Sequence, residues 1–169
     1  PMKLKGLVMS KFPKLFIKTK IDPTAVVLFT SGSETLPKAV PLTHDNVVHD
    51  LWGGLNIIDI RLQSIFLSFL PPFHSFGFTV LSILPLITGV KVAYTPNPTN
   101  FGEVLDALKN TKANNIMATP TFLKMLMAKA EPDDMASVEL VISGAESLHI
   151  DIKTQFEKMT AGHNSLIIE

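Results

Sequence analysis

Short apolar runs recur along the chain, and their spacing constrains the fold more than any other feature. The runs begin near Ala25, Ile65, Lys91, Asn115, Glu139 and Ser165. The last five starts lie about 25 residues apart, a length that fits one strand followed by one helix. Within each run the apolar residues are contiguous rather than alternating, as expected for parallel strands that helices cover on both faces. The pattern predicts an α/β fold with a mainly parallel sheet.

Segments with helical periodicity separate these runs. We expect helices over residues 44–58, 78–87, 102–110, 121–130 and 150–158. In the fourth of them, Phe122, Leu123, Leu126 and Met127 recur at the spacing of one helix face. No linker or low-complexity tract interrupts the series, so we expect a single α/β unit over residues 23–169 after a lead-in segment, residues 1–22.

Composition and charge exclude several classes of function. The 15 basic and 15 acidic residues balance and form no basic block, so nucleic acid is not an expected partner. The chain has no cysteine, which excludes a disulfide framework, a thiol nucleophile and a thiolate metal site. The histidines lack the spacing of metal ligands. We therefore expect no metal site built from these residues alone.

Two segments bear on membranes. Residues 76–90 are apolar but contain Pro85 and Gly89, and they fall short of the roughly 20 residues of a spanning helix, so a buried helix is expected. The lead-in segment alternates lysines with apolar residues. Two interpretations of it stay open: a solvated strand, or a contact with an anionic membrane.

A polar, glycine-bearing loop follows the first apolar run. It reads Thr-Ser-Gly-Ser-Glu-Thr-Leu-Pro-Lys over residues 30–38. Hydroxyls and backbone N–H groups gather at a strand end, Gly32 permits close approach of a ligand, and Lys38 supplies a positive charge. It is not a Walker loop, because Pro37 and Ala39 stand where that loop has glycine and a hydroxyl residue. The pattern predicts a phosphate-binding loop.

Three more loops with polar or glycine residues follow expected strands, at residues 70–77, 119–121 and 143–148. In an open parallel sheet, ligands bind beyond the carboxyl ends of the strands, so we expect all four loops at one end. Alternatives remain open for single residues. His74 also suits a hydrogen-bonded core position, and Glu146 also suits the positive end of the helix that follows it.

Together these motifs resemble the adenylate-forming enzymes, the superfamily of acyl-CoA synthetases and firefly luciferase. The agreement continues through Pro-Leu-Thr-His-x-Asn at 41–46, Leu-Pro-Pro-Phe-His-Ser-Phe-Gly at 70–77, Thr-Pro-Thr-Phe at 119–122 and Gly-Ala-Glu at 144–146. Within the superfamily, the chain looks most like the acyl-acyl-carrier-protein synthetase part of bacterial 2-acylglycerophosphoethanolamine acyltransferase. The resemblance implies part of the large N-terminal domain of such an enzyme.

The resemblance also implies a reaction. A fatty acid carboxylate would attack the α-phosphate of ATP with Mg²⁺ present, giving acyl-adenylate and pyrophosphate. A phosphopantetheine thiol, of acyl carrier protein or CoA, would then take the acyl group. Such chemistry depends chiefly on charge stabilisation at the phosphates. A cytoplasmic location is implied, with the cytoplasmic face of the inner membrane and a fused lysophospholipid acyltransferase left open.

The resemblance assigns roles by position. The residues implied at the triphosphate are Thr30, Ser31, Gly32, Ser33, Glu34, Pro37 and Lys38. Those implied at the acyl pocket are Phe73, His74, Gly77 and Thr119, and those implied beside adenine are Gly144, Ala145 and Glu146. Lys38 and His74 are the catalytic candidates. Thr35 and Ala39 depart from the glycines usual in the family.

After Glu169 the family would continue with Gly-Tyr-Gly-x-Thr-Glu and later a C-terminal lid domain. We therefore expect residues 1–169 to be a fragment that lacks the lid, turns over little by itself and self-associates through exposed apolar surface. A non-catalytic nucleotide-binding or regulatory module is one alternative. A serine hydrolase is the weaker one, because no Gly-x-Ser-x-Gly motif is present.

Overall fold

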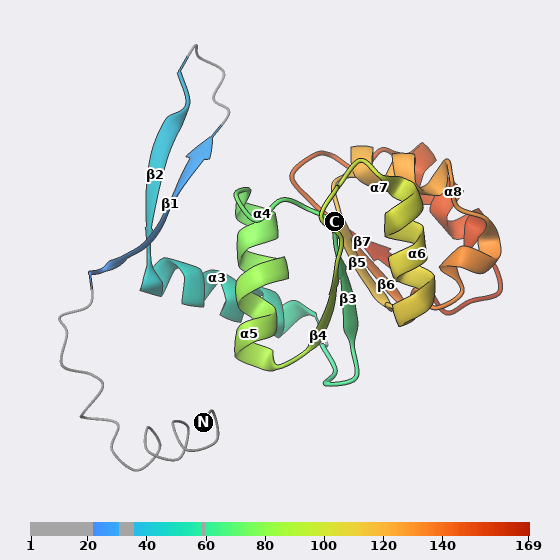
Figure 1. Cartoon of the computed structure of the whole chain (residues 1–169), viewed down its shortest axis with the longest axis horizontal. Helices are drawn as coiled ribbons and strands as arrows, with labels where there is room; N and C mark the ends of the chain where they lie inside the picture. The colour runs from blue at the N-terminus through green and yellow to red at the C-terminus, as the bar shows by residue number, and fades with distance from the viewer. Residues whose placement is uncertain (1–21, 31–35, 59) are drawn as a thin grey trace.

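A five-stranded parallel sheet forms the centre of the molecule (Figure 1). The computed structural model describes residues 22–30, 36–58 and 60–169. The strands are β3 (Ile65–Ser68), β4 (Lys91–Tyr94), β5 (Asn115–Ala118), β6 (Leu140–Ser143) and β7 (Leu166–Ile168). The predicted parallel α/β sheet is confirmed.

The strand order is β4-β3-β5-β6-β7. From β3 the chain moves outward to β4, then returns past β3 to β5 and continues to β6 and β7. Phe66 of β3 accordingly lies opposite Val92 on one side and Asn115 on the other. The direction of winding therefore reverses between β3 and β5, which is the place where open α/β sheets bind ligands.

Helices cover both faces of this sheet (Figure 1). One face carries α6 (Phe101–Thr111), α7 (Pro120–Met127) and α8 (Ile150–Met159), and a 3₁₀ turn, η2 (Pro132–Met135), packs beside α6. The other face carries α3 (His44–Ile57) and a helical segment over residues 75–88. The strand residues between them, among them Phe66, Leu67 and Ile116, are fully buried. Burial from both sides explains why the strands have contiguous apolar runs.

A capping box begins α3. Thr43 Oγ1 accepts the N–H of Asn46 at 3.1 Å, and Asn46 Oδ1 accepts the N–H of Thr43 at 3.0 Å. These two bonds satisfy amide groups that the first helical turn leaves without partners. The Thr-His-x-Asn part of the sequence motif therefore has a local structural role.

The helical segment over residues 75–88 is continuous but irregular. It consists of α4 (Ser75–Phe78), the π-helical η1 (Thr79–Ile83) and α5 (Leu84–Thr88). Pro85 has no N–H to donate to the carbonyl of Leu81, four residues earlier. The phenol of Tyr94 donates to that carbonyl instead, at 2.7 Å. The proline thus explains the irregular turn. The expected helix is present, but it is only partly buried, because Leu86 and Ile87 are exposed.

The sequence pattern predicts the first apolar run as a strand of the parallel sheet, and that prediction is wrong. β1 (Thr24–Thr30) pairs antiparallel with β2 (Lys38–Thr43), and the two form a separate ribbon (Figure 1). Phe29 is 65% exposed. Pro41 argues against a central strand, but both strands of a two-stranded ribbon are edges, where proline is tolerated.

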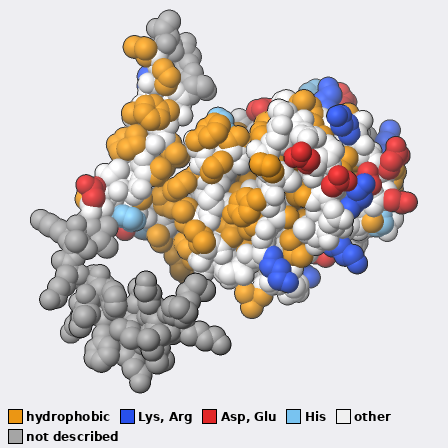
Figure 2. Space-filling view, viewed as in Figure 1, with side chains coloured by type: hydrophobic (Ala, Val, Ile, Leu, Met, Phe, Trp, Pro, Cys, Tyr) orange, Lys and Arg blue, Asp and Glu red, His pale blue; other side chains and the backbone are white. Residues whose placement is uncertain are grey.

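Apolar side chains gather over the ribbon, α3 and α5, whereas charged side chains gather over the side that carries α6 to α8 (Figure 2). The exposed apolar residues on these elements include Val27 and Phe29, Val48 and Trp52, and Leu86 and Ile87. The expected self-association is consistent with this surface and stays a prediction. None of the described helices reaches the length and apolarity needed to cross a bilayer.

Candidate functional site

Three of the four predicted loops meet at the carboxyl ends of β3, β5 and β6. The N–H of Gly144 donates to the carbonyl of Ala118 at 3.3 Å, which joins the loop after β6 to the end of β5. A Cβ added at Gly144 would lie 3.7 Å from the ring of Phe76, at the start of the segment after β3. The loops therefore converge at the point where the winding of the sheet reverses.

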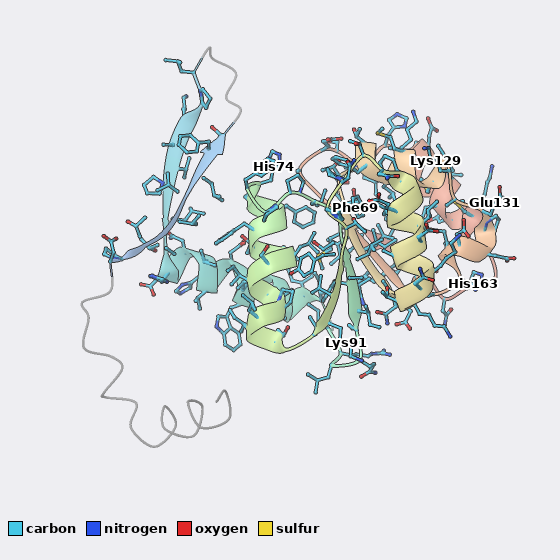
Figure 3. The ribbon with its side chains drawn as sticks, in the orientation of Figure 1. Phe69, His74, Lys91, Lys129, Glu131 and His163 are labelled. Atoms are coloured by element: carbon cyan, nitrogen blue, oxygen red, sulfur yellow. The ribbon has the colours of Figure 1, made fainter. Side chains whose placement is uncertain are left out.

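His74 lies at this end of the sheet and is exposed to solvent. It immediately precedes α4, and its ring lies 4.9 Å from that of Phe73, centroid to centroid. Figure 3 shows His74 and Phe69 towards one end of the sheet and Lys91 at the opposite end. The interpretation of His74 as a buried core residue is therefore wrong, and its side chain is available to a ligand.

Strand β1 of the ribbon lies beside the residues around His74. An apolar hollow of about 370 Å³ lies between β1 and the residues around His74. Its lining residues are Val26, Val27, Leu28 and Phe29 on one side and Pro72, Phe73, His74 and Phe78 on the other. Thr30 and Lys38 pair at the end of the ribbon. The predicted phosphate loop therefore connects β1 to β2 after this pair.

Part of that loop lies outside the described residues. Ser31, Gly32, Ser33, Glu34 and Thr35 belong to this part, so their predicted contacts with phosphate stay predictions. Thr30, Pro37 and Lys38 are described and exposed.

Gly77 has a packing role. It is buried, and a Cβ there would lie 2.2 Å from the carbonyl oxygen of Pro71. Only glycine allows the helical segment to approach the 70–77 loop this closely. The predicted place of Gly77 in an acyl pocket is untested, but its effect on the loop that carries His74 is direct.

Thr119 is the N-cap of α7, and its hydroxyl accepts the N–H of Phe122 at 3.3 Å. The carboxylate of Glu146 reaches the first turn of the same helix. Glu146 Oε2 accepts the hydroxyl of Thr121 at 2.6 Å and its N–H at 3.3 Å. The interpretation that Glu146 complements the helix following it is therefore wrong, because α8 is instead capped by His149, which accepts the N–H of Asp151 at 3.4 Å.

Sequence reasoning missed three participants in this loop cluster. These are Thr121, Phe76 and Glu169, whose Oε1 accepts the N–H of Leu148 at 3.1 Å. Thr121 and Phe76 belong to the Thr-Pro-Thr-Phe and Phe-His-Ser-Phe-Gly motifs, so the sequence could have identified them as candidates. Glu169 follows an apolar strand and had no such signal.

A second hollow, of about 160 Å³, lies between α3, the 75–88 segment and the sheet. Its lining is mainly apolar and includes Leu51, Phe76, Val80 and Met117, with Asp50 as the acidic residue among the described ones. Phe76 belongs to this hollow and also faces Gly144. The hollow therefore has room for an apolar group next to the loop cluster.

The described residues contain no group of three or more His, Asp or Glu side chains that could hold a metal ion. Polar contacts to a ligand at this end of the sheet would therefore come from hydroxyls, backbone N–H groups, His74 and Lys38. Apolar contacts would come from the two hollows.

Comparison with known proteins agrees with the family resemblance of the sequence motifs. The family model described as AMP-binding enzyme matches residues 9–168. The chain is 28% identical over 153 residues to the long-chain-fatty-acid–CoA ligase of Bacillus subtilis (strain 168), covering 85% of this chain and 27% of that protein. It is 33% identical over 121 residues to acyl-CoA ligase SID4 of Ajellomyces capsulatus, covering 69% of this chain and 20% of that protein. The chain therefore spans only a minor part of the length of these relatives.

Solved structures agree in fold. ATP-bound MatB from Rhodopseudomonas palustris aligns with a TM-score of 0.75 and 25% identity, over 89% of this chain and 30% of that chain. MenE from Bacillus subtilis in complex with AMP aligns with a TM-score of 0.72 and 22% identity, over 88% of this chain and 36% of that chain, and shows the fold alone. With a family match over residues 9–168, the chain belongs to the AMP-binding enzyme family.

Proposed function

We propose that this chain is the nucleotide-facing part of a longer ligase that activates a fatty acid with ATP. A carboxylate oxygen attacks the α-phosphorus, the bond from that phosphorus to pyrophosphate breaks, and an acyl-adenylate forms. The thiol of CoA then takes the acyl group and AMP leaves, with acyl carrier protein as the alternative acceptor. The observation that carries the proposal is the convergence of the Phe-His-Ser-Phe-Gly, Thr-Pro-Thr and Gly-Ala-Glu loops where the sheet reverses its winding.

The phosphates would lie at the end of the ribbon. Lys38 supplies one positive charge there, and the hydroxyls and N–H groups of the hairpin connection supply hydrogen-bond donors. The described residues offer no cluster of carboxylates that would hold Mg²⁺. Lys38 would stabilise the negative charge that develops on the phosphates during the reaction.

The acyl group would use the apolar hollows. Ligand pockets are mostly apolar with a few converging polar groups, and the hollow beside His74 and the one behind Phe76 have that character. His74 would face the carboxylate from the rim, while Phe76 would separate the acyl group from the base. The fatty-acid assignment is supported by the apolar linings and by similarity to fatty-acid–CoA ligases.

The test is carboxylate-dependent exchange of pyrophosphate into ATP, measured with fatty acids of several lengths on this chain and on a longer protein that carries it. Lys38→Ala should slow exchange by roughly 5- to 150-fold, the effect of losing about 1–3 kcal/mol from one charge-assisted phosphate contact. Lys129→Ala, an exposed lysine next to α7, is the matched control and should exchange at the unaltered rate.

Unchanged exchange in the Lys38→Ala protein would remove Lys38 from the mechanism. ATP binding without any exchange, in the longer protein as well, would favour a non-catalytic nucleotide-binding module over a ligase.

A further inference from the structure

The carboxylate of Glu146, an exposed residue, is hydrogen-bonded to another part of the protein. One of its oxygens, Oε2, accepts both the hydroxyl and the N–H of Thr121, at 2.6 and 3.3 Å. The two residues lie 25 positions apart in the chain. Glu146 thus ties the loop after β6 to the first turn of α7, the helix after β5. A carboxylate at a helix N-terminus is also favoured by the exposed N–H groups and by the helix dipole.

The backbone conformation of the residue before Glu146 requires contacts of this kind to hold it in place. Ala145 has a φ of 70°, in the left-handed region that residues other than glycine rarely adopt. A residue stays in that region only when its surroundings hold it there. On the amino side, the N–H of Gly144 binds the carbonyl of Ala118. On the carboxyl side, Glu146 binds Thr121, so Ala145 is held between two fixed points.

The fixed stretch is the one that faces Phe76. The backbone at Gly144 lies next to the Phe76 ring, because a Cβ at that position would make an ordinary van der Waals contact of 3.7 Å with the ring. A planar base binds well against a peptide surface that is already held in place, because little has to be ordered on binding.

We propose that Glu146 is a positioning residue: through Thr121 it fixes the backbone at Gly144 and Ala145, and this backbone forms the surface that receives the base of the nucleotide. The inference rests on the proposed function for the identity of the ligand. It gives Glu146 no direct contact with ATP. The base-binding surface depends on a contact between two loops that follow neighbouring strands.

The experiment compares binding of ATP with binding of tripolyphosphate, which has the phosphates but no base. Glu146→Ala should weaken ATP binding about tenfold, as expected when a charge-assisted tie is lost, and should leave tripolyphosphate binding unchanged. In exchange assays the KM for ATP should rise while the KM for the carboxylic acid stays the same. Glu157→Ala, an exposed glutamate of α8, is the matched control and should change neither.

Two variants of the partner residue separate positioning from general destabilisation. Thr121→Val removes the hydroxyl and should weaken ATP binding in the same way, whereas Thr121→Ser retains it and should bind ATP normally. Once Glu146 is alanine, Thr121→Val should have no further effect, because the two side chains form one contact. If Glu146→Ala does not fold, the valine and serine variants decide the question.

Equal losses for ATP and tripolyphosphate, unchanged ATP binding in Glu146→Ala or Thr121→Val, or additive effects of the two changes would each overturn the inference. The proposed function fails on a different result. An unaltered protein that binds ATP but shows no carboxylate-dependent exchange contradicts the ligase and leaves the binding comparison intact. An unaltered protein that binds no ATP overturns both.

Discussion

Gly77→Ala should distort the loop that carries His74. A Cβ at position 77 would lie 2.2 Å from the carbonyl oxygen of Pro71, 2.9 Å from its carbonyl carbon and 3.2 Å from the carbonyl oxygen of Leu70. All three are backbone atoms, so no side-chain rotation relieves the contact. Either the helical segment or the loop has to move.

The cost can be worked out from these contacts. Forcing an extra methyl group into a packed position costs typically about 1–3 kcal/mol. The Pro71 carbonyl also accepts the N–H of His74 at 3.2 Å, and losing that bond adds about 0.5–1.5 kcal/mol. The better helix propensity of alanine returns up to about 1 kcal/mol. The net loss of unfolding free energy should be between about 0.5 and about 4.5 kcal/mol, with about 2–4 °C of melting temperature per kcal/mol for a chain of this size.

Urea and thermal unfolding measure this loss, with Gly53→Ala as the matched control. Gly53 is also helical, but no described atom lies within 4 Å of a Cβ added there. Alanine at 53 should therefore stabilise the protein by about 0.5–1 kcal/mol. Two substitutions of the same kind should have opposite signs. A Gly77→Ala protein as stable as the unaltered one would refute the close approach of loop and helix.

Two further predictions concern stability away from the loop cluster. The N–H of Glu131 lowers the pKa of the Asp134 carboxyl, burial opposes this, and Lys109, at 3.3 Å, lowers it further. A lowered folded pKa stabilises the protein above the unfolded value of about 3.9, and the effect is lost as the pH falls through the folded pKa. Asp134→Asn should therefore lower the unfolding free energy by about 0.5–1 kcal/mol at pH 7 and by almost nothing in strong acid. Urea titrations across this range test it, and a pH-independent difference would contradict it. Tyr94→Phe removes the donor to the Leu81 carbonyl and should cost about 0.5–1.5 kcal/mol in thermal unfolding; an unchanged melting temperature would show that solvent replaces the phenol.

The parallel sheet could be predicted because strands that are buried on both faces appear in the sequence as short, contiguous runs of apolar residues. The expected starts at Ile65, Lys91 and Asn115 are the first residues of β3, β4 and β5, and the expected start at Glu139 is one residue before β6. β3, β5 and β6 lie inside the sheet between two helical layers, so most of their residues are apolar and buried. A strand of this kind can be located from local sequence alone.

The pairing of the first run could not be predicted in the same way. Its residues Val26, Val27 and Leu28 are as apolar as those of the sheet, yet they pair with a neighbouring segment that contains Pro41. Composition reports which residues avoid water, but it does not report which strand is the partner. The contact of Glu146 with Thr121 was missed for a related reason, because it joins loops 25 residues apart and has no periodicity.

The sequence motif assigned Gly77 and His74 to the same acyl pocket, and the structure couples them through one backbone group. The carbonyl oxygen of Pro71 accepts the N–H of His74, and the same atom is the one that a side chain at Gly77 would strike. The glycine therefore sets how closely the helix approaches the loop, and this approach in turn fixes the backbone that presents the histidine. In Gly77→Ala, a displaced His74 should therefore accompany the loss of stability. Because both residues depend on the Pro71 carbonyl, there is a physical reason for finding them in one short motif.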